Sequence, residues 1–310
     1  MKILIIGAAG LVGRALVQRL TAESRHQLTL LDRVPYISQP DISQPDDLRV
    51  HVGDFGDSDV VAPLLAETDA VVLLASVLGG AAEADYGLSR RVNIDSTLKL
   101  FESLRRHSAP ARVVFASTIA VFGVPMPLYV DDSTVPAPSM IYGAQKLMME
   151  IALSHFTRRG WMNAMALRLP GIMARAEDNG TQKAAFMNRL FYSFRAGQDV
   201  RMPIGEDATM WIQSVGQVAW NCAHALEVPA ARLGDVRAFT LPALRVRIGD
   251  LIDALRRRYP DSRSRIIFDI DADLTAQFGN YPLLKTPLAD GLGFLPDANL
   301  DSLVAHAIPA

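Results

Sequence analysis

Short apolar runs alternate with longer amphipathic segments along the first half of the chain. The runs are rich in Val, Ile and Leu and continuously apolar, as expected for strands covered by helices on both faces. This alternation predicts βαβ units and an α/β fold with a doubly wound parallel sheet. The expected strands are Lys2–Ile6, Leu28–Asp32, Leu48–Val52, Ala70–Ala75, Arg112–Ser117 and Ala164–Leu169, and the expected helices are Leu11–Thr21, Asp59–Leu65, Leu88–His107 and Ile141–Arg159.

The alternation of apolar runs and amphipathic segments ends after Leu169. A loop follows, then a helix near Gln182–Ala196 and a connection that contains Pro and Gly. We therefore expect one domain over residues 1–169 and a smaller C-terminal lobe over residues 170–310. A segment near residues 236–258 is expected to return to the first sheet.

Composition excludes several classes of protein. A formal net charge of −2, with both signs spread along the chain, gives no electrostatic reason to expect a nucleic-acid partner. No segment is long and apolar enough for a membrane span, and the run Ile3–Ile6 is too short for a signal peptide. Cys222 is the only cysteine, so a reducing cytoplasm is expected. The six histidines show no paired ligand spacing, and no metal site is expected.

Three glycines, Gly7, Gly10 and Gly13, follow the first expected strand and open the first expected helix. Small residues there let the backbone approach a pyrophosphate, and the helix N-terminus offers free N–H groups. An ordinary tight turn is the alternative. Asp32 favours the cofactor, because it ends the second expected strand, where a carboxylate can accept hydrogen bonds from ribose hydroxyls. Its charge favours NAD over NADP, although Arg33 beside it could accommodate a ribose phosphate.

Tyr142 and Lys146 are four residues apart and therefore lie on one face of an expected helix. A free phenol has a pKa of about 10, but a nearby ammonium stabilises the phenolate, which can then act as a general base. The pattern is common by itself. Its position matters here, because it follows Ser117 and Thr118, whose hydroxyls come at the end of the fifth expected strand.

Taken together, these features resemble the extended short-chain dehydrogenases/reductases, the NAD-dependent epimerase/dehydratase superfamily, over nearly the whole chain. The resemblance implies a Rossmann-like, NAD-binding domain at residues 1–169 and a mainly substrate-binding lobe after it. It also implies a homodimer formed through the two longest helices, with a monomer as the alternative. Counting back from Gly123 assigns the family's catalytic hydroxyl to Thr118, although Ser117 can also form hydrogen bonds. The implied catalytic residues are Thr118, Tyr142 and Lys146.

The family's cofactor contacts carry over to matching positions. Asp54 and Phe55 follow the third expected strand, where the adenine is usually contacted, and Asn93 usually joins strands near the site. The implied cofactor residues are Gly7, Gly10, Leu11, Val12, Gly13, Asp32, Arg33, Asp54, Phe55, Leu74, Ala75, Ser76, Asn93, Tyr142, Lys146, Pro170 and Ile172.

Two stretches, residues 75–86 and 167–175, resemble the branch of NAD enzymes that contains the D-erythronate dehydrogenases. The diphosphate clamp of the nucleotide-sugar members is replaced here. Arg175 could instead pair with a substrate carboxylate and Trp211 could wall off a small pocket, or they could be a loop ion-pair partner and a core aromatic. The implied substrate contacts are Ser76, Thr118, Tyr142, Arg175 and Trp211.

The expected activity is NAD-dependent oxidation of a secondary alcohol in a small polyhydroxy acid, such as a tetronate, to the keto acid, with Tyr142 as general base. The first alternative is a sugar or nucleotide-sugar epimerase or dehydratase that retains its NAD. A dehydratase would usually place further acid and base groups beside Thr118, and Ile119 supplies none. The second alternative is a cofactor-sensing regulator, a class that often lacks the tyrosine.

Overall fold

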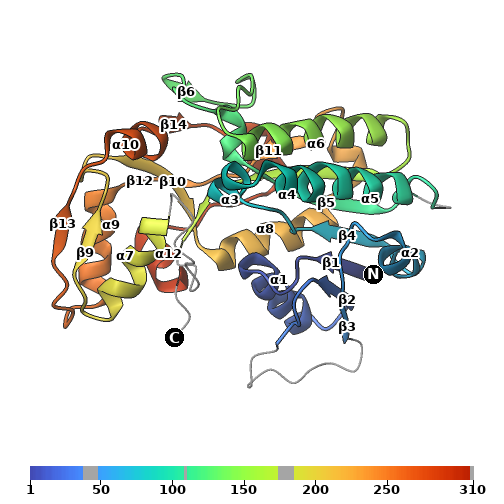
Figure 1. Cartoon of the computed structure of the whole chain (residues 1–310), viewed down its shortest axis with the longest axis horizontal. Coiled ribbons are helices and arrows are strands. Elements are labelled where there is room, and N and C mark those ends of the chain that lie inside the picture. The colour runs from blue at the N-terminus through green and yellow to red at the C-terminus, as the bar shows by residue number, and fades with distance from the viewer. Residues whose placement is uncertain (38–47, 108–109, 174–184, 308–310) are drawn as a thin grey trace.

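The central sheet consists of seven parallel strands in the order β11-β7-β5-β4-β1-β2-β3 (Figure 1). The computed structural model of the chain describes residues 1–37, 48–107, 110–173 and 185–307. Strand order reverses between β1 and β4, which confirms the predicted doubly wound fold. The strands are β1 (Lys2–Ile6), β2 (Gln27–Asp32), β3 (Leu48–Val52), β4 (Ala70–Leu73), β5 (Arg112–Thr118), β7 (Asn163–Leu169) and β11 (Ala238–Thr240).

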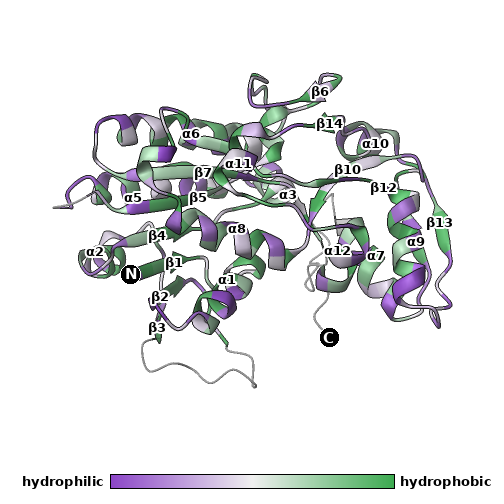
Figure 2. Cartoon of the chain, turned by 180° about the vertical axis from the view of Figure 1, so that it is seen from behind, coloured by the Kyte–Doolittle hydropathy of each residue, from purple (hydrophilic) through white to green (hydrophobic). Residues whose placement is uncertain are grey.

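Both faces of the inner strands of this sheet are apolar and covered by helices, whereas the edge strand β3 is mostly exposed. Ile3 and Ile5 of β1 belong to one buried cluster, whereas Leu4 and Ile6 belong to another on the opposite face. Figure 2 shows β1 in the hydrophobic colour, whereas the helices have mixed colours. This two-sided burial explains why the expected strands match the observed ones so closely. The covering helices are α1 (Leu11–Ala22) and α8 (Val215–Glu227) on the first face, and α2 (Ser58–Ala66), α5 (Thr97–Leu104) and α6 (Ile141–Arg158) on the second.

The third expected helix contains an irregular turn that the sequence pattern did not indicate. In place of one regular helix, the structure has α4 (Tyr86–Arg90), a π-helical turn η1 (Arg91–Ser96) and then α5. Asn93 lies inside the π-helical turn and is buried. Turns of this kind often mark functional positions. The short helix α3 (Gly79–Ala84) precedes them.

The second half of the chain builds a separate apolar cluster. Of the segment expected to return to the central sheet, only β11 does so. Helix α9 (Ile248–Arg258) instead packs against α12 (Leu300–Ala307), and its buried residues Leu251 and Leu255 belong to the apolar cluster of the second half of the chain.

The remaining elements are β6 (Tyr129–Val130), β8 (Gly171–Ile172), β9 (Val200–Met202), β10 (Thr209–Gln213), β12 (Leu244–Arg247), β13 (Ile266–Phe268), β14 (Leu283–Leu284), α7 (Ala185–Arg195), α10 (Ala272–Phe278), α11 (Pro287–Leu292), η2 (Ile119–Phe122) and η3 (Ala230–Arg232).

Candidate active site

A pocket of about 800 Å³ opens at the carboxyl ends of the parallel strands. Its lining includes residues at or directly after the ends of β1, β2, β3, β4, β5 and β7. Doubly wound sheets bind their ligands at this edge, next to the reversal of strand order. The opposite wall comes from β8, α7, β10 and α10, so the pocket lies between the central sheet and the elements of the second half of the chain.

The glycine loop packs closely against the protein's own backbone at two of its glycines. Gly7 has φ +90°, and a Cβ there would lie 2.6 Å from the backbone nitrogen of Ala75. A Cβ on Gly13 would lie 2.3 Å from the carbonyl oxygen of Gly7, so neither position accepts a side chain. Gly10 is the N-cap residue of α1 and has no side chain to cap the helix, which leaves the first N–H groups of α1 available to an anion. These features fit the pyrophosphate of a dinucleotide.

Asp32 is aimed at the glycine loop. Its Oδ2 accepts a hydrogen bond from the backbone nitrogen of Ala9 at 2.9 Å, and its Oδ1 accepts one from Val34 at 3.3 Å. Two backbone donors therefore fix the carboxylate at the mouth of the cavity, where it can still accept hydrogen bonds from ribose hydroxyls.

Of the cofactor residues expected from the sequence, all line this pocket except Asn93 and Lys146. The side chain of Asn93 has partners within the protein, which suits the other expectation, that it joins segments near the site. Its Oδ1 accepts from the backbone nitrogen of Val77, and its Nδ2 donates to the carbonyl of Val77 and to Oε1 of Gln145, at 2.8, 2.9 and 2.8 Å. Both amide protons are used, so Asn93 holds the segment after β4 rather than a ligand.

Lys146 lies beneath the pocket surface. It is buried, its Nζ donates to the carbonyl of Ala116 at 2.7 Å, and that nitrogen lies 5.8 Å from the centre of the Tyr142 ring and 4.5 Å from that of Phe115. Burial lowers the pKa of Lys146 to about 7, against the opposing effect of the Glu150 carboxylate.

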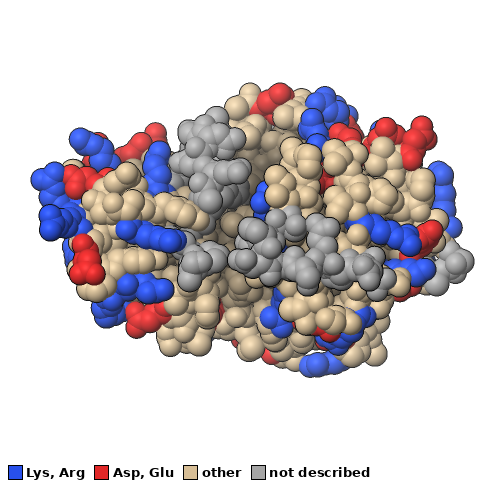
Figure 3. All heavy atoms as spheres, turned by 90° about the horizontal axis from the view of Figure 1, so that it is seen from below, with Lys and Arg blue, Asp and Glu red and all other residues tan. Residues whose placement is uncertain are grey.

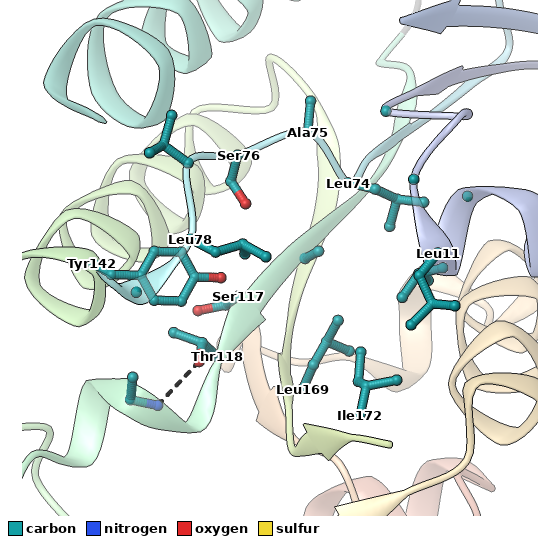
Figure 4. A pocket seen from close by; sticks show the side chains of 18 of the residues that line it. Leu11, Leu74, Ala75, Ser76, Leu78, Ser117, Thr118, Tyr142, Leu169 and Ile172 are labelled. Carbon is teal, nitrogen blue, oxygen red and sulfur yellow. Dashed lines mark hydrogen bonds between the residues drawn. The ribbon is translucent and has the colours of Figure 1, made fainter. Parts of the chain in front are cut away.

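The two candidate hydroxyls at the end of β5 differ in their partners. Figure 4 shows the hydroxyl of Tyr142 pointing toward Ser117 and Thr118. Ser117 donates its proton to Glu150 Oε1 at 2.5 Å, whereas Oγ1 of Thr118 accepts from the backbone nitrogen of Ala120 at 3.1 Å. Within the described part of the chain, no group accepts a hydrogen bond from Thr118. Its proton is thus the one available to a ligand.

The substrate end of the pocket departs from the expectation in part. Trp211 lines it, but the side chain is fully buried, and its Nε1 donates to the carbonyl of Pro282 at 2.8 Å. The indole packs edge-on against Phe122 and Tyr281, so it offers a wall and no hydrogen bond. Ser76 also lines the pocket, and Arg175 lies outside the described residues. Lining residues that the sequence did not suggest include Met140, Met173, Met187, Asn188, Phe278 and Tyr281.

A buried ion pair behind the site was also not anticipated. Glu150 of α6 is 3% exposed, and Nη2 of Arg168, on β7, donates to its Oε2 at 2.7 Å. The one available signal was spacing, because Glu150 follows Lys146 by one helical turn and shares its face of α6.

Three potential metal ligands, Glu23, His26 and Glu227, meet at the surface although their sequence spacing gave no indication of it. Arg25 forms ion pairs with both carboxylates, and its guanidinium already supplies the positive charge there. The group therefore makes a poor metal site.

Charges of both signs are interspersed on the face of the molecule seen in Figure 3, in keeping with the formal net charge of −2. Among the described residues, no helix has the length and apolar character needed to cross a membrane.

Comparison with known proteins identifies the class. Residues 3–231 match the NAD dependent epimerase/dehydratase family. The chain is 32% identical to a D-erythronate dehydrogenase from Cupriavidus necator, over 98% of this chain and 97% of that protein. It is 26% identical to a D-erythronate dehydrogenase from Haemophilus influenzae, over 99% of each. A solved structure of a nucleoside-diphosphate-sugar epimerase from Agrobacterium tumefaciens has a TM-score of 0.88 at 28% identity, and the match covers 98% of this chain and 92% of that one.

These matches define an oxidoreductase that acts on a CH–OH group with a nicotinamide cofactor. The chain belongs to the NAD dependent epimerase/dehydratase family, within the extended short-chain dehydrogenases/reductases.

Proposed function

We propose that the chain is an NAD-dependent dehydrogenase that oxidises a secondary alcohol of a small polyhydroxy acid, such as a tetronate, to the keto acid. The observation that carries this proposal is the similarity to two D-erythronate dehydrogenases over essentially the full length of all three chains. In this proposal, residues 1–169 hold the cofactor and residues 170–310 mainly hold the substrate.

In the proposed reaction, the glycine loop and Asp32 would hold NAD, whose nicotinamide would supply the acceptor for the hydride that leaves the alcohol carbon. Tyr142 removes the hydroxyl proton as general base, and its phenolate is stabilised by the ammonium of Lys146. The hydroxyl of Thr118 donates a hydrogen bond to the substrate oxygen and so orients it. Removal of one hydride and one proton from the alcohol leaves the carbonyl.

NAD, rather than NADP, is favoured by Asp32. Its carboxylate is fixed by the backbone donors of Ala9 and Val34, so it cannot easily turn away from a ribose phosphate. The negative charges of the Asp32 carboxylate and of a ribose phosphate bound beside it would repel each other. Arg33 also lines the pocket and is the group that would favour NADP.

We also propose a cytoplasmic homodimer. Leu98 of α5 and Met148 and Ile151 of α6 are exposed by 38%, 51% and 63%, and a second copy would bury them. Light scattering of the wild-type chain and of Met148→Glu/Ile151→Lys tests this, because a dimer in both samples rules out that face. The cytoplasm suits Cys222, a buried lone thiol that needs no partner.

The activity is tested by incubating the purified protein with NAD and a panel of sugar acids while following reduced cofactor by its absorbance. Oxidation of one or more hydroxy acids is expected, with far less activity on NADP. The proposal fails if no acid is oxidised and the cofactor instead stays bound while a nucleotide sugar is epimerised.

A further inference from the structure

A buried charge network lies directly behind the candidate proton-transfer residues. Glu150 accepts a hydrogen bond from the hydroxyl of Ser117. It also forms an ion pair with Arg168, whose Nε and Nη2 lie 3.0 and 2.7 Å from its two carboxylate oxygens. These groups come from three elements, β5, β7 and α6. The side chains of Glu150 and Arg168 are 3% and 12% exposed, so water screens them little.

The network contains two cations and one anion. Lys146 and Arg168 are positive, and Glu150 is the anionic side chain that acts on the buried ammonium of Lys146. Among the described residues, the carbonyl of Ala116 and the rings of Tyr142 and Phe115 also lie beside the ammonium of Lys146. Of these groups only the Tyr142 phenol can become an anion, and that phenolate is the form that Lys146 stabilises.

Arg168 has further neighbours besides Glu150. Asp132 lies close enough for Arg168 to oppose the upward shift that burial gives the pKa of this carboxyl, and the Phe122 ring stacks over the guanidinium at 5.3 Å. Asp132 therefore balances part of the charge of Arg168 from the outer side. On the inner side, Glu150 is the carboxylate that acts on both Lys146 and Arg168.

We propose that Glu150 is a positioning residue for proton transfer, whose carboxylate ties back Ser117 and supplies the counter-charge that keeps the ammonium of Lys146 beside Tyr142. Because Ser117 is tied to α6, Thr118 is the hydroxyl that meets the substrate. This inference rests on the proposed function to the extent that Tyr142 is the general base.

The sign of the effect follows from the distances along α6. In Glu150→Gln the anion is lost, and Arg168, whose charge Asp132 balances only in part, repels the ammonium of Lys146, so Lys146 releases its proton at lower pH. Tyr142 then loses its stabilising cation. Glu150 is two helical turns from Tyr142, about 12 Å along the axis, and Lys146 is one turn from each, so the loss of the lysine charge outweighs the direct effect of the glutamate charge.

The test is a spectrophotometric titration of the Tyr142 phenol in the full chain with saturating NAD, obtained as the difference from Tyr142→Phe. Glu150→Gln is expected to move this titration upward by about one pH unit, the low end of the effect of a close charge. The pH profile of kcat/KM should move with it, giving roughly tenfold lower activity at neutral pH. Glu102→Gln, an exposed carboxylate of α5, is the matched control and should change neither.

Glu150→Gln/Arg168→Met separates charge from structure. The double variant removes both members of the pair, so its net charge equals that of the wild type, and neutral replacements of buried pairs often fold well. Its titration is expected within about half a unit of the wild type, closer than that of Glu150→Gln. A folded Glu150→Gln with an unshifted titration overturns the proposal. So does a double variant that is shifted by a full unit, and this second criterion holds even if the single variant does not fold.

The titration needs no substrate. If the wild type oxidises none of the sugar acids, the proposed function fails, while the shift of the Tyr142 phenol still decides the role of Glu150.

Discussion

Asn93→Leu is the substitution for which the structure gives the most definite cost. The wild-type side chain is 1% exposed and makes three hydrogen bonds, two to the backbone of Val77 and one to Gln145. Leucine has nearly the same shape but no polar atom. The substitution leaves one buried donor and two buried acceptors without a partner, and each such group costs about 1–3 kcal/mol. We expect a loss of about 3 kcal/mol in the free energy of unfolding.

The loss of stability is measured as a change in melting temperature. At roughly 2 °C per kcal/mol for a chain of this size, Asn93→Leu should melt about 6 °C below the wild type. Asn280→Leu is the matched control, because Asn280 is exposed and its side chain makes one long bond, at 3.4 Å, to Thr275. It should melt within about 1 °C of the wild type.

The same variant tests whether Asn93 shapes the cofactor site from a distance. The segment that it holds carries Ser76 and Val77, which line the pocket. If loss of these hydrogen bonds lowers the binding free energy of NAD by about 1.4 kcal/mol, the Kd of NAD rises tenfold, and calorimetry measures this change. Unchanged NAD affinity in a destabilised protein would refute the role in the site. Unchanged stability would refute the hydrogen-bond account itself.

Three further predictions concern single positions. Tyr142→Phe should lower kcat by about 10²–10⁴ with little change in NAD affinity, and full turnover in steady-state assays would exclude Tyr142 as the base. Asp32→Ser should raise the ratio of kcat/KM for NADP to that for NAD by about tenfold, because about 1.4 kcal/mol of repulsion is relieved; an unchanged ratio contradicts the assigned contact. Burial raises the pKa of Cys222 from 9.0 to about 12, so the native thiol is almost fully protonated at about pH 8 and should react about a thousandfold more slowly with a disulfide reagent than after unfolding. Equal rates before and after unfolding would show that the thiol is accessible.

The inner strands of the sheet could be predicted from the sequence because they are buried on both faces and therefore read as apolar runs, whereas the exposed edge strand β3 has polar residues between its apolar ones. The cofactor side of the pocket followed from the same pattern. Each of its segments comes directly after a strand, as Gly7 follows β1 and Ala75 follows β4, so neighbours in the fold are marked by their position in the sequence. The π-helical turn at Asn93 left no such mark, since its residues continue an ordinary helical pattern.

The substrate side could not be predicted in this way. Met187, Met210 and Phe278 reach the pocket from α7, β10 and α10, and no spacing in the sequence connects three elements that meet only through tertiary packing. Trp211 shows the same limit, because an aromatic residue in an apolar strand has the same pattern whether its ring meets a ligand or the core. Here the indole lines the pocket and also packs in the core, and its only polar atom donates to the carbonyl of Pro282.

The choice between Ser117 and Thr118 shows what tertiary contacts add to a motif. The two hydroxyls are adjacent and equally able to form hydrogen bonds, so the sequence favours Thr118 only by counting from Gly123. Within a strand, neighbouring side chains point to opposite faces, and β5 is buried on both. One hydroxyl must therefore find a partner inside the protein, and Glu150 provides it for Ser117. The carboxylate that satisfies the hydroxyl of Ser117 thus leaves the hydroxyl of Thr118 facing the pocket, and Glu150 itself lies one helical turn from Lys146.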